Sequence, residues 1–246
     1  MSGHSKWATI KHAKGAADAK RGQMFTKLIK EISIAARMGG GNPEGNPRLR
    51  TAILKARGAN MPKDNIDRAI KKGTGELEGV NYEELTYEAY APGGVAVLIE
   101  VLTDNKNRAA ADVRNILTRA GGSLATAGAV SRLFKRKGII TFDGEKYTED
   151  QIMEAALEGG AEDVALSDGI IEVSTAPEDF EPVVNALQNK QFESMSAEIS
   201  MVPEVEVNLD SDGTAKAVRL IEKLEDNDDV QNVYSNISIP DGFEAE

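Results

Sequence analysis

The chain contains no cysteine, and this absence removes several kinds of chemistry. Disulfides, cysteine-based zinc sites, iron–sulfur ligation and thiol nucleophiles are excluded. Histidine is scarce: His4 and His12 are the only two, and no acidic residue comes before Asp18. A metal site or a catalytic pair there has little support. No apolar run approaches the roughly 18 residues of a membrane span, and the first residues lack the apolar block of a secretory signal.

The common catalytic motifs are also missing. The sequence has no Gly-x-Ser-x-Gly, no phosphate-binding P-loop and no His-Glu-x-x-His. Asp210-Ser211-Asp212-Gly213 begins like a calcium loop, but Glu222 would lie inside the helix that follows, so a helix N-cap is the better interpretation. We therefore expect a non-enzymatic protein with no cofactor, no metal and no small-molecule substrate.

Charge divides the chain into two unlike parts. Residues 1–72 hold 16 basic and five acidic side chains, a net charge of +11, whereas the remaining residues carry −22, which gives −11 overall. A one-signed excess in a short segment is typical of proteins that bind a polyanion such as nucleic acid. A basic face that is merely solvated is the alternative.

The first 16 residues show no hydrophobic periodicity and predict a mobile arm. Trp7, the only tryptophan, lies there between Lys6 and Lys11. It could stack on a base while the lysines contact phosphates, or it could fold back as a core anchor. Both interpretations stay open.

Three helices are predicted next. Over Asp18–Met38, apolar residues recur on one helical face, and four basic residues fall within an arc of about 100° on the opposite face. The apolar residues are Phe25, Leu28, Ile29, Ile32 and Ala36, and the basic ones are Lys20, Lys27, Lys30 and Arg37. Such a basic stripe suits a phosphate backbone. Asn46-Pro47 and Pro62 open two further helices, and no recognition helix stands out.

Gly73–Asn81 is predicted to be a linker, and from Tyr82 the pattern changes to strands and helices. Leu85–Ala91 and Val95–Leu102 flank Pro92-Gly93-Gly94, which predicts a hairpin. A helix over 108–120 and a strand over Val130–Phe134 follow. Residues 138–201 have the order β-α-β-β-α-β of a ferredoxin-like unit, with capping boxes expected at Thr148–Gln151 and Thr175–Glu178. The tail supplies a strand over Val205–Leu209, a helix, and a strand over Val230–Tyr234.

The predicted fold class is multidomain α+β, with a three-helix domain followed by two ferredoxin-like α+β sandwich domains. A β-α-β tail cannot bury both of its faces alone, so we expect it to pair with the earlier half-domain across an insertion. The expected boundaries are 1–78, then 79–137 joined with 202–246, with 138–201 inserted. Three consecutive domains with a loose tail are the alternative.

Several blocks resemble one family. They are Met1–Ala8, Asp18–Gly22, Phe25–Ile32, Asn46–Arg50, Asn60–Met61–Pro62 with Ile66–Ile70, and Tyr90–Gly94. Over essentially its whole length the chain resembles the bacterial YebC/PmpR family, which has mitochondrial relatives that activate translation of cytochrome oxidase subunit I. The resemblance implies a cytoplasmic, non-enzymatic protein with a helical first domain and two α+β domains, the third inserted in the second.

The resemblance implies two versions of one function. Bacterial members are generally named transcriptional regulators that bind DNA. The mitochondrial relatives and some bacterial members point instead to ribosome association, contact with ribosomal RNA and relief of stalled translation. The nucleic-acid-binding candidates implied are His4, Ser5, Lys6, Trp7, Lys11, His12, Lys14, Lys20, Arg21, Lys27 and Lys30, to which the helical pattern adds Arg37, Arg48 and Arg50.

Three other hypotheses remain. The acidic part of the chain after residue 72, here called the acidic body, could dock a basic protein partner, so that the chain acts as a protein-interaction module. It could instead cover the basic first domain, here called the head, without any partner, as an electrostatic autoinhibition. An enzyme acting on nucleic acid has only unplaced carboxylates in its favour.

Overall fold

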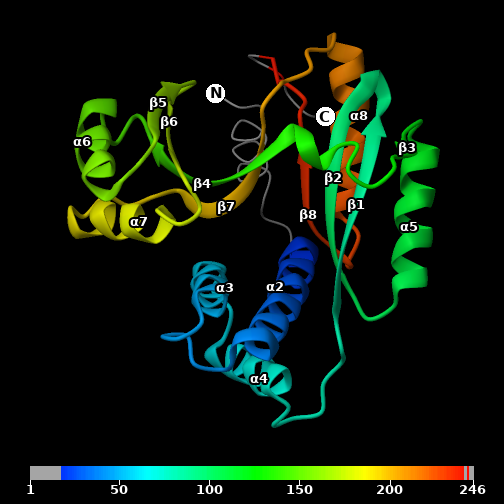
Figure 1. The fold of residues 1–246 in the computed structure, drawn as a ribbon, viewed down its shortest axis with the longest axis horizontal. Coiled ribbons are helices and arrows are strands. Elements are labelled where there is room, and N and C mark those ends of the chain that lie inside the picture. The colour runs from blue at the N-terminus through cyan, green and yellow to red at the C-terminus, as the bar shows by residue number, and fades with distance from the viewer. Residues whose placement is uncertain (1–17, 241–242, 244–246) are drawn as a thin grey trace.

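The computed structural model describes residues 18–240 and 243, and their side chains from Arg21 onward. Three parts can be distinguished: a helical head and two α+β units, each built on a four-stranded sheet (Figure 1). This architecture confirms the predicted fold class.

Within the described residues, the head has three helices that share one apolar core. The helices are α2 (Asp18–Gly39), α3 (Pro47–Gly58) and α4 (Lys63–Thr74). Ile32, Leu49 and Ala56 are fully buried between them. Asn46 begins α3 as predicted: its side-chain oxygen accepts from the Leu49 N–H at 3.1 Å, and its amide donates to the Ala35 carbonyl at 2.8 Å.

The first α+β unit combines segments from both sides of the second. Its elements are β1 (Glu83–Ala91), β2 (Val95–Thr103), α5 (Lys106–Arg119), β3 (Ser123–Leu124), α8 (Ser211–Glu225) and β8 (Val230–Ser235). The sheet order is β3-β1-β2-β8. Side chains of α5 and α8 pack on one face of this sheet, where Val97, Val113 and Leu220 lie in a common core. Asp210 caps α8 by accepting from the Gly213 N–H at 2.8 Å, in agreement with the N-cap interpretation.

The second α+β unit has the ferredoxin-like arrangement. Its elements are β4 (Phe134–Asp143), α6 (Glu149–Gly159), β5 (Asp163–Ser167), β6 (Ile170–Thr175), α7 (Phe180–Asn189) and β7 (Ser196–Pro203). All neighbouring strands are antiparallel, in the order β5-β6-β4-β7. Thr148 and Gln151 form the predicted capping box at the start of α6.

A two-stranded ribbon joins the two α+β units. Strands β4 and β7 pair from Phe134↔Pro203 to Thr141↔Ser196 and run from one unit into the other (Figure 1). At one end Phe134 packs against the first sheet beside Leu98. Further along, Ile140 belongs to the core of the second unit. The two strands of the ribbon are therefore the covalent connection between the second unit and the first.

Three local predictions were wrong. Val130–Phe134 was expected to be a strand, but Ser131–Leu133 forms a short 3-10 turn, η2, and β4 begins at Phe134. The Glu88 carboxylate is the physical reason, because it accepts the backbone N–H groups of Gly128, Val130 and Ser131 and so holds this segment as a loop.

The other two errors concern a strand and a cap. Of the strand expected over Val205–Leu209, only a single bridge from Val207 to Ile237 forms, and Val205 is exposed. The capping box expected at Thr175–Glu178 does not form. Thr175 is the buried last residue of β6, its hydroxyl donates to the adjacent Ala176 carbonyl at 2.8 Å, and α7 starts only at Phe180.

Candidate nucleic-acid interface

Part of the predicted interface lies outside the described residues. This applies to His4, Ser5, Lys6, Trp7, Lys11, His12 and Lys14. Lys20 is in the first turn of α2, but its side chain is likewise outside the described residues, whereas Arg21 is exposed on the next position.

Lys30, at the centre of the predicted basic stripe, is buried against the first α+β unit. Its ammonium donates to Asp229 Oδ1 and to the Asp228 carbonyl, each at 2.8 Å. The second oxygen of Asp229 accepts from Arg108 Nε at 3.0 Å and Nη2 at 2.7 Å. Burial alone would raise the pKa of Asp229, but the hydrogen bonds from Lys30 and Arg108 outweigh burial and hold this pKa below its ordinary value. One carboxylate therefore ties α2 to α5.

Two neighbours of Lys30 on the stripe also have protein partners. Lys27 Nζ donates to the Glu225 carbonyl at 2.5 Å, and Arg37 donates to Asn81 Oδ1 at 3.0 Å and to the Tyr82 carbonyl at 2.6 Å. The structure thus differs from the open basic stripe that the sequence predicts. The face of α2 opposite its apolar core docks on the loop between α8 and β8.

The arginines of α3 are paired as well. Arg48 contacts Glu31, with Nε–Oε1 at 2.7 Å, and also Glu84. Arg50 is bidentate to Glu181 of α7, with Nη2 2.7 Å and 2.9 Å from the two carboxylate oxygens. The acidic body therefore supplies counter-charges to the same cations that the sequence assigns to phosphates.

A set of exposed cations remains on α3 and α4 of the head. Within the described part of the chain these side chains make no hydrogen bond or ion pair: Arg57, Lys63, Arg68, Lys71 and Lys72. Asp64 and Asp67 offset the charge in the first half of α4, so the positive charge concentrates at its carboxyl end, around Lys71-Lys72. We call these five cations the outer basic patch. None of the five is among the residues predicted from the sequence, although the Lys71-Lys72 pair was a visible signal.

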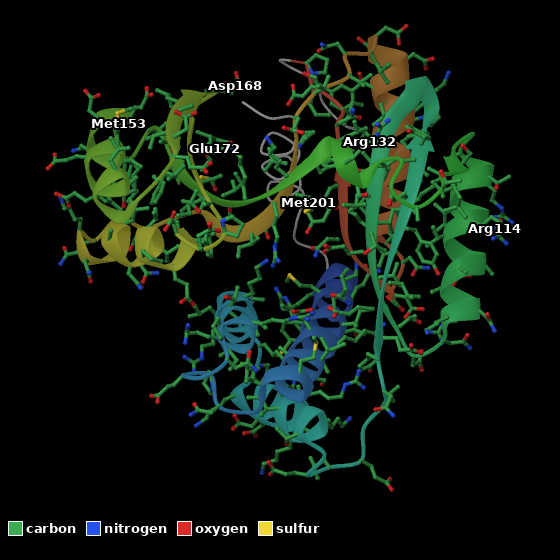
Figure 2. The ribbon with its side chains drawn as sticks, viewed as in Figure 1. Arg114, Arg132, Met153, Asp168, Glu172 and Met201 are labelled. Atoms are coloured by element: carbon green, nitrogen blue, oxygen red, sulfur yellow. The ribbon has the colours of Figure 1, made fainter. Side chains whose placement is uncertain are left out.

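Other cations of the chain lie away from this patch. Figure 2 shows Arg114 pointing outward from α5, on the side of the molecule remote from the head, and Arg132 next to the ribbon. Among the residues that the structure describes, no three metal-ligating side chains converge, and no helix combines the length and apolarity needed to cross a membrane.

Two family models together match most of the chain. The model described as the TACO1/YebC protein N-terminal domain matches residues 5–76, and the one described as the TACO1/YebC second and third domain matches residues 82–237. The chain belongs to the TACO1/YebC family, which confirms the resemblance drawn from the sequence.

Close relatives extend over the full chain. A "probable transcriptional regulatory protein" of Treponema denticola is 70% identical over 244 residues, covering 99% of each chain. One of Treponema pallidum is 66% identical over 240 residues, covering 98% of each. The crystal structure of a conserved hypothetical protein from Aquifex aeolicus is similar with a TM-score of 0.83 and 47% identity, covering 91% of this chain and 93% of that one. The relatives' names describe regulators rather than enzymes, in agreement with the expectation of a non-enzymatic protein.

Proposed function

We propose that this protein is a cytoplasmic, non-enzymatic regulator of gene expression that binds nucleic acid through its basic head. The separation of charge along the chain carries the proposal, because the first 72 residues hold +11 while the rest hold −22. The outer basic patch supports it, since its five exposed cations form no ion pair with the described residues. The relatives named transcriptional regulatory proteins support the regulatory part.

The patch favours recognition of phosphates over recognition of bases. Its cations are exposed on α3 and α4, and contacts from such side chains to phosphates position a protein on a backbone without reading sequence. Duplex DNA and folded ribosomal RNA both present that backbone. The transcriptional version follows the relatives' names. The translational version, in which the protein associates with the ribosome, follows the family resemblance and the absence of an evident recognition helix.

Sedimentation of cell lysate through a sucrose gradient separates the two versions. Co-migration with ribosomes that is lost at high salt, and lost from a variant without residues 1–16, is the result expected for a ribosome-associated factor. Migration at the top of the gradient, together with recovery of the protein on chromosomal DNA, supports the transcriptional version. Ribosomal co-migration that withstands both salt and nuclease would contradict phosphate binding and indicate that the acidic body docks a protein.

A further inference from the structure

Two ion pairs connect the head to the second α+β unit. Arg50 of α3 binds Glu181 at the start of α7, and Lys55 Nζ lies 2.8 Å from Glu198 Oε2 of β7. All four side chains are substantially exposed, 36% and 46% for the first pair and 43% and 36% for the second. Exposed pairs of this kind contribute little stability and are screened by salt.

In the part of the chain that the structure describes, no apolar core reinforces this contact. Among the described residues, the core around Leu49 contains side chains of the head alone, and the core around Ile152 contains side chains of the second unit alone. The head is attached differently to the first unit, where the Lys30 and Asp229 side chains are only 9% and 5% exposed. The contact between the head and the second unit is therefore weaker than the contact between the head and the first unit. The second unit is otherwise connected to the molecule by the β4–β7 ribbon.

One of the two paired cations of α3 lies on the same side of the helix as a member of the outer basic patch. Arg57 lies seven residues after Arg50, two helical turns along α3, and therefore on the same side of the helix. It is exposed and has no partner in the described structure. A carboxylate bound to both oxygens by a guanidinium has the geometry that a phosphate takes in the same position. Glu181 thus holds Arg50 in an arrangement that suits a nucleic-acid backbone.

We infer that the second α+β unit is a movable cover over α3, and that nucleic-acid phosphates displace Glu181 and Glu198 from Arg50 and Lys55 when the protein binds its target. The inference rests on the proposed function and adds to it an autoinhibitory contact. In the closed state Glu181 and Glu198 neutralise two cations of α3. Displacement leaves Arg50 free on the same side of α3 as Arg57, and leaves Lys55 free elsewhere on the helix.

Distances between attached spin labels test the movement on the full chain. Because the protein has no cysteine, introduced cysteines are the only labelled positions. The pair Asp67→Cys with Asn185→Cys spans head and second unit, and the pair Asp67→Cys with Ala111→Cys spans head and first unit. All three positions are exposed on helices. Addition of a 20-base-pair DNA duplex, or of its RNA counterpart, is expected to lengthen the first distance and leave the second unchanged.

Affinity for the same duplexes gives an independent readout. Glu181→Gln/Glu198→Gln removes the competing carboxylates and should tighten binding by about two- to tenfold, the range expected for two exposed ion pairs. Glu154→Gln/Glu158→Gln is the matched control, because it removes two acids that pair with Lys190 inside the second unit. The control should bind like the parent protein apart from the small effect of net charge.

The outcomes separate this inference from the proposed function. Binding of duplex with an unchanged Asp67–Asn185 distance, and with equal affinities for the two double variants, overturns the cover and leaves nucleic-acid binding intact. Failure of every variant to bind either duplex overturns both.

Discussion

Lys30 and Asp229 are 199 residues apart in the chain, and their side chains meet at 2.8 Å in a nearly solvent-free contact. A buried charge must be paired, because removing one partner leaves the other without compensation. Arg108 shares the Asp229 carboxylate, so one acid holds together the head, α5 and the loop before β8. The orientation of the head on the body depends on this contact.

Asp229→Ala should therefore destabilise the protein by about 3–5 kcal/mol, since it leaves the Lys30 ammonium buried without a counter-ion. Urea unfolding followed by circular dichroism measures the loss. Asp212→Ala is a suitable control because its pair with Lys216 is exposed on α8, and its unfolding midpoint should stay near that of the parent. Equal midpoints for Asp229→Ala and the parent would show that the contact does not stabilise the fold.

Glu172 should make stability depend on pH. It lies on β6 (Figure 2), and burial raises its pKa from 4.5 to about 7. Because the folded pKa is above the unfolded one, the protein loses stability as pH rises from about 4.5 to 7, where the unfolded chain releases the proton first. Glu172→Gln should stabilise the protein by about 1–3 kcal/mol at pH 8 and have no effect at pH 4.5. A variant effect of equal size at both pH values would contradict this assignment.

Asn46 should be intolerant of substitution. It is buried, its oxygen caps α3, and its amide donates to the carbonyls of Ala35 and Gly40 at the end of α2. Asn46→Ala leaves these groups unsatisfied and should cost about 2–3 kcal/mol. Thr51→Ala, a change at a half-exposed position within α3, serves as the control in the same thermal unfolding experiment. A melting temperature no lower than that of the control would disprove the role of the cap.

Substitutions of Lys30 and of the Lys71-Lys72 pair should affect different properties, the first the stability of the fold and the second the binding of nucleic acid. Lys30→Gln breaks the buried contact and should lower the unfolding midpoint. Lys71→Glu/Lys72→Glu changes only exposed side chains, so it should leave the midpoint almost unchanged while weakening binding to nucleic acid. Both variants are measured by urea unfolding and by duplex binding. Loss of stability in the lysine pair variant would mean that the outer basic patch has a structural role.

Local signals in the sequence predict the elements well because they depend on neighbours in the chain. The caps at Asn46, Thr148 and Asp210 each use a side chain and a backbone N–H three residues later, so the sequence contains everything they need. The failed cap at Thr175 shows the limit, since burial at the end of β6 redirects its hydroxyl. The ferredoxin-like order is likewise visible from alternation and turn residues.

The candidate site was harder to predict because its partners are distant in sequence. The helical period alone places Lys27 and Lys30 on a polar face of α2. Nothing near them in the sequence indicates their partners, the Glu225 carbonyl 198 residues away and the Asp229 carboxylate 199 residues away. One signal was present: Ile34 lies about 180° from Phe25 at 100° per residue, in the middle of the basic stripe, and it is buried. An apolar residue there indicates that the stripe faces protein. The outer basic patch was not predicted because Asp64 and Asp67 cancel part of its positive charge when the charges of α4 are added together.

Binding of a fluorescent 20-base-pair duplex to the full chain, in DNA and RNA form and over a range of salt concentrations, is the measurement that decides whether the head binds phosphates. The parent protein should bind with an affinity that falls steeply with salt, and Lys71→Glu/Lys72→Glu should reduce the slope by about 1 to 2. Lys146→Glu/Lys216→Glu, which changes two exposed lysines outside the head, should keep the parent slope. Absence of binding by the parent, or an equal loss of slope in both double variants, would contradict a phosphate-binding head.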